Sequence, residues 1–102
     1  MTQHNTERII EEFLGGNPRA TEWRALRQAL EGRLISLRRQ RQREAEDGAP
    51  EARLASLDAQ ITALDRQVAT LETEEAVAQF VEDSIKYTVA QSDLEAGLEE
   101  EE

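Results

Sequence analysis

The chain has no cysteine among its 102 residues, and His4 is its only histidine. Disulfide bridges and thiolate metal sites are therefore excluded, and no second histidine can join His4 at a metal or activate a serine. The sequence also lacks a glycine-rich phosphate loop and a His-Glu-x-x-His motif. It therefore predicts a protein that is not an enzyme, with no catalytic residue, no metal site and no resident cofactor.

Large apolar side chains are also scarce, because aromatic residues make up 4% of the chain while charged residues make up 33%. Such a chain can bury one stripe per helix in a thin rod, but it cannot fill a thick core. No apolar run reaches the roughly 18 residues of a membrane span, and no signal peptide opens the chain. We expect a cytoplasmic protein without membrane contact, and a homodimer or a partner that covers more of its apolar surface.

Charge of one sign dominates, with a formal net charge of −10 that is unevenly spread. Residues 18–46 carry eight arginines against four glutamates, whereas residues 47–102 carry fifteen acidic residues against three basic ones. The opposite signs favour pairing between the two segments, and an acidic surplus remains after that pairing. This surplus argues against direct nucleic-acid binding and favours a basic protein partner.

Two apolar stripes are present, and they mirror each other about residues 47–50. Spacings of three and four place each stripe on one side of a helix. If the chain folds back at the break, residues whose numbers sum to about 98 face each other, such as Leu37 and Ile61. The sequence thus predicts an all-α fold, an antiparallel helical hairpin with a coiled-coil seam. The predicted seam consists of Trp23, Leu26, Leu30, Leu34, Leu37, Leu54, Leu57, Ile61, Leu64, Val68 and Leu71.

Helix-capping and helix-breaking residues predict one helical domain over residues 6–92. We expect a disordered start at 1–5, and a short helix at 6–14 whose Phe13 approaches Phe80. Long helices follow at about 18–46 and 51–92 around the turn at 47–50. The expected acidic tail at 93–102 is disordered.

Two irregularities interrupt the predicted long helices. Gly32 lies inside the first of them, where a glycine costs about 1 kcal/mol relative to alanine, so we expect another backbone to approach it closely. In the second long helix, the regular spacing of apolar residues is interrupted at residues 72–75. Apolar residues then resume out of phase at Val77, Phe80, Val81, Ile85 and Val89.

Arginines replace apolar residues as the first long helix nears the turn. Arg38, Arg39, Arg41 and Arg43 lie opposite Leu54 and Leu57 in the predicted hairpin. Arginine stems can cover these leucines while the guanidinium groups reach water or Asp58. An anion site, for a phosphate or an acidic protein patch, is the alternative interpretation.

One segment carries a pattern that is more specific to a protein family than leucine spacing is. Residues 27–38 read RQALEGRLISLR, which resembles the helix of the actinobacterial coiled-coil anti-sigma factors that respond to cyclic di-GMP and hold a WhiG-type sigma factor. That family is an antiparallel helical hairpin whose helix carries a pattern close to Arg-Arg-x-Leu-Gln-Gly-Arg-Ile-Asp-x-Leu-Arg. The matching positions here are Arg27, Leu30, Gly32, Arg33, Leu34, Leu37 and Arg38.

The resemblance implies a regulator that sequesters a sigma factor by covering its DNA- or polymerase-binding surfaces. Arg27, Gly32, Arg33 and Arg38, with Arg39, Arg41 and Arg43, are then the candidate partner- or ligand-binding residues. The family's nucleotide motif, Glu-x3-Ser-x2-Arg-x3-Gln-x3-Asp, is not retained. Its positions are occupied by Ala20, Arg24, Arg27, Glu31 and Ile35, and only Arg27 agrees. We therefore expect no tight binding of cyclic di-GMP.

Two other functions fit the same pattern. A generic coiled-coil assembly or scaffold protein would be a self-contained oligomer without a sigma factor. A regulator that inserts a hairpin into the secondary channel of RNA polymerase would use tip carboxylates such as Asp47 and Glu51 to help hold a metal. Arginines beside these acids oppose metal binding at the tip.

Overall fold

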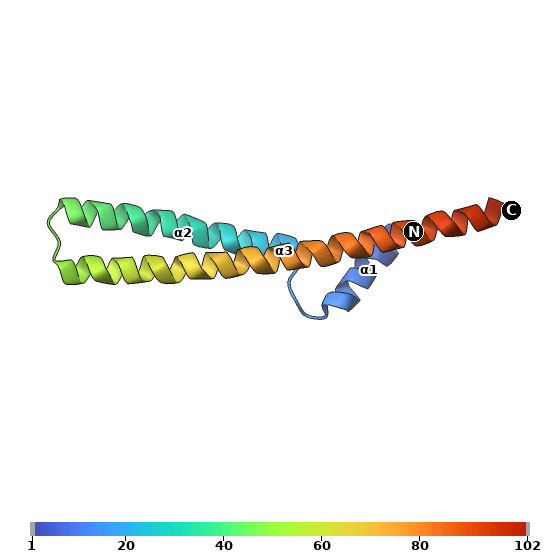
Figure 1. The fold of residues 1–102 in the computed structure, drawn as a ribbon, viewed down its shortest axis with the longest axis horizontal. Helices are drawn as coiled ribbons and strands as arrows, with labels where there is room; N and C mark the ends of the chain where they lie inside the picture. The colour runs from blue at the N-terminus through green and yellow to red at the C-terminus, as the bar shows by residue number, and fades with distance from the viewer. Residues whose placement is uncertain (1, 102) are drawn as a thin grey trace.

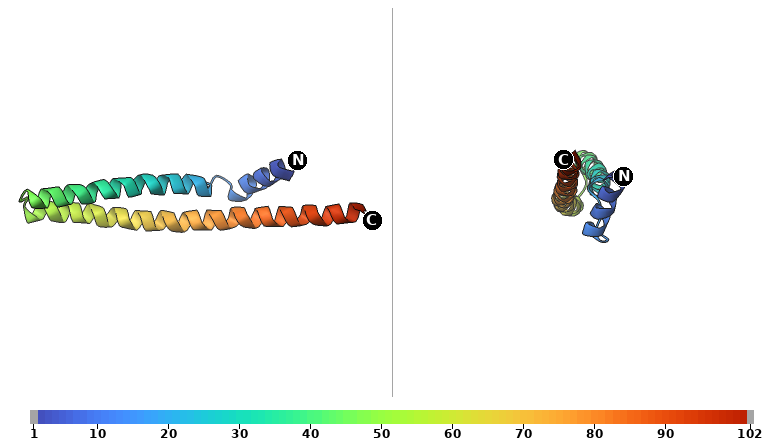
Figure 2. Two further views of the ribbon diagram at one scale, coloured as in Figure 1. Left: turned by 90° about the horizontal axis from the view of Figure 1, so that it is seen from above. Right: turned by 90° about the vertical axis from the view of Figure 1, so that its right-hand side faces the viewer.

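A computed structural model describes the backbone of residues 2–101 and the side chains of residues 6–95. The described residues form three helices and no strand: α1 (Thr2–Leu14), α2 (Ala20–Glu46) and α3 (Glu51–Glu101). The molecule is a rod with extents of 79 × 20 × 16 Å. α2 and α1 follow one another along α3 (Figures 1 and 2), so the fold is all-α and extended.

The turn between α2 and α3 is built from hydrogen bonds that end one helix before the next begins. The Ala49 N–H donates to the Glu44 carbonyl at 2.9 Å, and the Gly48 N–H donates to the Ala45 carbonyl at 3.2 Å. This Schellman pattern requires a left-handed residue, and Gly48 supplies it with a φ of +79°. Pro50 then precedes the first turn of α3, because it cannot continue α2. The chain therefore reverses at residues 47–50.

α2 lies beside the first half of α3 and runs in the opposite direction (Figures 1 and 2). Ion pairs fix the register: Arg41 Nε lies 3.1 Å from Asp58 Oδ1, and Arg24 Nε lies 3.0 Å from Glu75 Oε2. The residue numbers of both pairs sum to 99, next to the value of 98 expected from the stripes. Six residues along this contact are buried: Leu34, Leu37, Leu57, Val68, Leu71 and Ala78.

The predicted seam departs from the structure at Leu26, which is 48% exposed. At 100° per residue, Leu26 lies about 80° around α2 from the buried Leu34, whereas Arg27 lies only about 20° from it. Arg27 therefore occupies the side of α2 that faces α3. The remaining predicted seam residues are half-buried, namely Trp23, Leu30, Leu54, Ile61 and Leu64.

A polar layer explains why the regular spacing of apolar residues in α3 is interrupted at residues 72–75. Glu75 faces α2, and its two carboxylate oxygens accept hydrogen bonds from Arg24 Nε at 3.0 Å and Arg27 Nε at 2.9 Å. Arg27 also donates to Glu31 at 2.9 Å. The side chains of Arg27 and Glu75 are 20% and 16% exposed. A shared ion-pair layer thus replaces one apolar layer between the helices.

α2 begins at Ala20, two residues later than the sequence predicts, because α3 supplies its cap. The Ala20 N–H donates to Glu82 Oε2 at 2.9 Å, and Arg19 Nε donates to Glu82 Oε1 at 2.6 Å. Arg19 also reaches α1, where its guanidinium lies 2.8 Å from Glu7. One arginine therefore ties together α1, the start of α2 and α3.

The outer ends of the helices differ from the expected ones. α1 begins at Thr2, within the segment expected to be disordered, and α3 continues to Glu101 in place of ending near 92. At about 1.5 Å per residue, the 51 residues of α3 span about 77 Å, whereas the 27 residues of α2 span about 40 Å. The second half of α3 therefore extends beyond α2, and of the other helices only α1 lies beside it.

Candidate protein-binding surface

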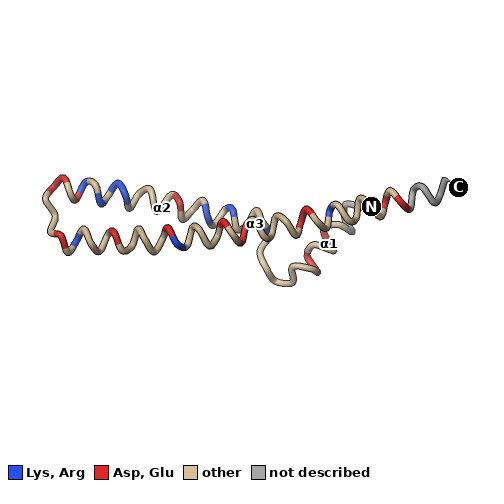
Figure 3. Tube along the Cα trace, in the orientation of Figure 1, with Lys and Arg blue, Asp and Glu red and all other residues tan. Residues whose placement is uncertain are grey.

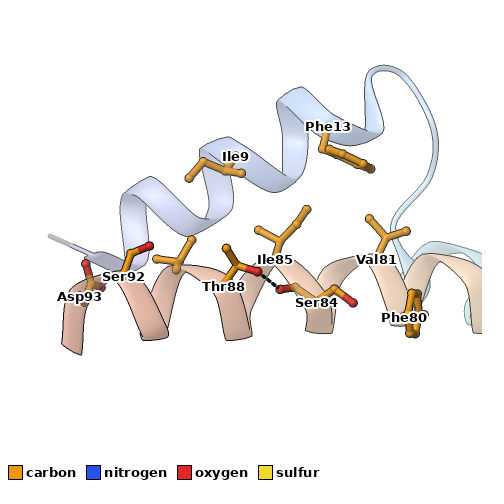
Figure 4. A pocket seen from close by; sticks show the side chains of 10 residues that line it. Ile9, Phe13, Phe80, Val81, Ser84, Ile85, Thr88, Ser92 and Asp93 are labelled. Carbon is orange, nitrogen blue, oxygen red and sulfur yellow. Dashed lines mark hydrogen bonds between the residues drawn. The ribbon is translucent and has the colours of Figure 1, made fainter. Parts of the chain in front are cut away.

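α1 and the second half of α3 enclose an open, mostly apolar groove (Figure 4). The groove has a volume of about 580 Å³. In Figure 4, Ile9 and Phe13 lie on α1 above Val81 and Ile85 of α3. Gly15, whose φ is +63°, follows the last residue of α1. The expectation that the short first helix lies against this part of α3 agrees with Figure 4, but the expected approach of Phe13 to Phe80 is not seen there.

The aromatic side chains of the groove are not packed against each other. Phe13 is 70% exposed and Phe80 is 73% exposed, although both line the groove. Ile9 is also 40% exposed, whereas its neighbour Ile10 is completely buried. In Figure 4, Phe13 extends over the groove from α1, whereas Phe80 lies at the edge, on the side of α3 turned away from α1. Exposed aromatic side chains beside a concave site are typical of protein-binding surfaces.

The second half of α3 carries more acidic than basic exposed side chains. Asp83, Asp93 and Glu95 are exposed there, with Lys86 as the exposed cation, and Asp93 lines the groove. Figure 3 shows the basic residues concentrated on α2, on the other half of the rod. The groove therefore combines an apolar floor with one acidic side chain, on a helix segment whose exposed charges are mostly negative.

A salt bridge joins Glu7 of α1 to Arg19 at the edge of this groove. The Arg19 guanidinium, by hydrogen bonding and by its charge, keeps the pKa of Glu7 below its usual range. The Glu7 side chain is 56% exposed, so this pair is worth little in water. α1 is thus attached to the rest of the rod chiefly by Ile10 and its apolar neighbours.

The arginines predicted to bind a partner fall into two groups. Arg27, Arg38 and Arg41 form ion pairs across to α3, with Glu75, Asp65 and Asp58 respectively. These three arginines therefore hold the two helices together. Leu57, which the arginine stems were expected to cover, is 1% exposed.

The other group faces outward. Arg33, Arg39 and Arg43 are exposed, and none of them forms an ion pair with a described side chain. Arg39 and Arg43 line a shallow polar hollow with Ser36. Gly32 is exposed on this side, and a Cβ built on it would meet nothing within 4 Å. The expectation that another backbone approaches Gly32 is therefore wrong within the described residues.

The tip of the rod holds no arrangement suited to a metal. Glu44 is bound by Arg53, whose Nε lies 2.8 Å from its carboxylate, and this hydrogen bond lowers the pKa of Glu44. Asp47 and Glu51 are exposed. The described residues contain no cluster of three or more potential metal ligands.

Sequence reasoning did not identify the groove or the capping role of Glu82. The groove was indicated in the sequence by the out-of-phase apolar residues after position 75, because these residues point away from the contact with α2. Nothing in the sequence indicates the role of Glu82, since a carboxylate 62 residues from the helix that it caps cannot be told from a solvent-exposed acid.

No helix in the described part of the chain is both long and apolar enough to cross a membrane. No protein-family model, no curated protein and no solved structure matches the chain.

Proposed function

We propose that the protein is a non-enzymatic, protein-binding regulator, in which α2 and the first half of α3 form an antiparallel coiled-coil hairpin. The hairpin is a stiff base, and the groove between α1 and α3 binds a helix of the partner. The exposure of Phe13 and Phe80 at the apolar groove carries this proposal. Aromatic side chains left open to water at a concave site gain most when a partner covers them.

Charge selects a basic amphipathic helix as the partner. Asp93 lines the groove, and the other exposed charges on this half of α3 are Asp83 and Glu95 against Lys86. A helix with an apolar face and basic flanks would fill the floor, pair with Asp93 and be attracted by the negative charge of this part of α3. The attraction is screened by salt, so binding should weaken as ionic strength rises.

The resemblance at residues 27–38 makes a WhiG-type sigma factor our proposed partner. Sigma factors bind DNA through basic helices, which an acidic rod can cover. The outward group Arg33, Arg39 and Arg43 would contact a second part of such an extended partner, because no described side chain pairs with them.

The test compares a purified WhiG-type sigma factor with a housekeeping sigma factor by calorimetric titration and by transcription in vitro. We expect binding and inhibition with the WhiG-type factor alone. Phe13→Glu should weaken binding at least about tenfold, since it places a charge in the apolar groove. Ala63→Glu is the control, at an exposed position on the first half of α3, outside the groove and outside the outward side of α2.

A synthetic basic amphipathic helix tests whether the groove binds a helix at all, separately from whether the partner is a sigma factor. Binding of this peptide that is lost in Phe13→Glu supports the groove as a protein-binding site even if neither sigma factor binds. Absence of binding for the peptide and both sigma factors would refute the proposed function. Unchanged affinity in Phe13→Glu would refute the assignment of the groove.

A further inference from the structure

α3 carries a second apolar stripe on the side opposite to α2. Phe80, Tyr87 and Leu94 recur at intervals of seven residues, and they are 73%, 70% and 60% exposed. The pattern is continued at steps of three and four by Ala69, Thr73, Ala76, Asp83 and Ala90. Such steps place all eight residues on one side of the helix. The stripe therefore has a coiled-coil spacing, with small residues before Phe80 and the exposed Asp83 between Phe80 and Tyr87.

A shallow hollow lies on this stripe at Ala76. Its walls are Thr73, Ala76, Val77 and Phe80, with Glu72 at its edge, and its volume is about 460 Å³. Residues at positions i, i+3, i+4 and i+7 form the hole that receives a side chain from a facing helix in a coiled coil. The small side chain of Ala76 leaves this hole deep enough for a large one.

We infer that a second copy of this chain binds the stripe, with the two α3 helices antiparallel and centred near residue 78. Facing residues then have numbers that sum to about 156. Phe80 enters the hole at Ala76 of the second copy, and Tyr87 faces Ala69 of the second copy. By the two-fold symmetry each contact occurs twice. Large residues thus meet small ones in both directions along the contact.

Charge favours this arrangement over its alternatives. Lys86 comes beside Glu72 of the second copy, and Arg66 comes beside Asp93 of the second copy. None of these four residues forms an ion pair with a described side chain of its own chain. Moving the centre by one heptad, to residue 85, brings Lys86 beside Lys86 of the second copy. A parallel pair in register places Phe80 on Phe80 and Glu72 beside Glu72.

The surface used here differs from the groove, although Phe80 borders both. The dimer does not depend on the proposed function, and its failure would leave the groove proposal intact. The two rods would overlap along most of α3, and the α3 residues of each groove would lie beside residues 63–75 of the second copy.

Sedimentation equilibrium tests the dimer directly. The wild-type chain should sediment at twice the monomer mass of 11.5 kDa. Ala76→Glu fills the hole with a charged side chain and should raise the dimer dissociation constant at least about tenfold. Ala63→Glu places the same change on another exposed side of α3 and should leave the constant unchanged. A wild-type monomer at millimolar concentration would overturn the inference, as would equal effects of the two variants.

A charge reversal tests the register. Lys86→Glu and Glu72→Lys should each weaken the dimer about threefold or more, and the double variant should restore the wild-type constant, because it re-forms both ion pairs with their signs exchanged. A double variant that is as weak as the singles would contradict the register.

Nitroxide labels test the direction of the two rods, since the chain contains no native cysteine. Val77→Cys lies near the centre and should give a short distance between copies. Ser56→Cys lies 22 residues from the centre, so its labels should be about 66 Å apart at 1.5 Å per residue. A short distance at both positions would show a parallel dimer and would overturn the antiparallel arrangement.

Discussion

Glu75 shows how a single residue can interrupt an apolar stripe without separating two helices. Its carboxylate receives one hydrogen bond from Arg24 and one from Arg27, both on α2. Arg27 belongs to the segment that resembles the anti-sigma helix, yet its guanidinium is used inside the protein. A residue that matches the motif of a binding family can therefore stabilise the fold without contacting a ligand.

This ion-pair layer makes stability depend on pH. The Arg27 hydrogen bond holds the pKa of Glu75 below its ordinary 4.5. The paired carboxylate therefore stabilises the fold above about pH 4.5, and that contribution is lost as the pH falls through the lowered pKa. Glu75→Gln should melt below wild type at pH 7, and the gap should close as the pH falls from 5 to 3. Thermal melts followed by circular dichroism would measure it, and a gap that does not change with pH would count against the layer.

Gly32 offers a second test at the scale of one residue. It lies within α2 at an exposed position where a Cβ meets nothing. Gly32→Ala should therefore stabilise the free protein by about 0.5–1 kcal/mol. Gly48→Ala is the matched control and should have the opposite sign, because the φ of Gly48 is +79°. Urea titration would compare them, and a destabilised Gly32→Ala would show that the glycine is needed within the rod.

At the scale of elements, α3 determines where α2 begins. Glu82 is buried, with 5% of its surface exposed, and it accepts hydrogen bonds from the Ala20 N–H and from Arg19. Ordinary N-caps come from the residue just before the helix. Here the cap comes from the neighbouring helix, so capping and packing are coupled.

Glu82→Ala should thus destabilise the protein by about 2 kcal/mol, since it leaves the buried Ala20 N–H and the half-buried Arg19 without this acceptor. Glu74→Ala, at an exposed position on the same helix, should change stability by less than about 0.5 kcal/mol. Urea unfolding of both variants decides the point. Equal stabilities would mean that water replaces Glu82 at the start of α2.

The elements also show which parts of the fold the sequence determines locally. Gly48 and Pro50 place the turn, because both act through their own backbone. The start of α2 was misplaced, since its cap is distant in the sequence. Leu26 was assigned to the seam because leucine spacing alone does not reveal that Arg27, paired with Glu75, faces α3. The candidate site could be foreseen only as apolar residues out of phase, because a groove depends on how α1 lies against α3.

At the scale of the whole molecule, the rod has two unlike halves. In one half α2 and α3 cover each other's apolar stripes, and the basic residues of α2 face the acidic residues of α3 (Figure 3). In the other half α3 has only α1 beside it, and its aromatic residues stay exposed. The division follows from the position of the turn, which makes α3 nearly twice as long as α2. The proposed binding surfaces exist because the shorter helix ends first.

Both proposed binding surfaces depend on the reversal of the chain at residues 47–50, and an intramolecular distance measures that reversal. Dyes attached at Ala29→Cys and Thr70→Cys, two exposed positions whose numbers sum to 99, can be followed by single-molecule energy transfer at concentrations too low for dimers. We expect high transfer efficiency, because packed helices lie about 10 Å apart and the separation stays below about 30 Å including the dye linkers. One uninterrupted helix would instead hold the two positions about 62 Å apart, and that result would contradict the fold and both binding surfaces.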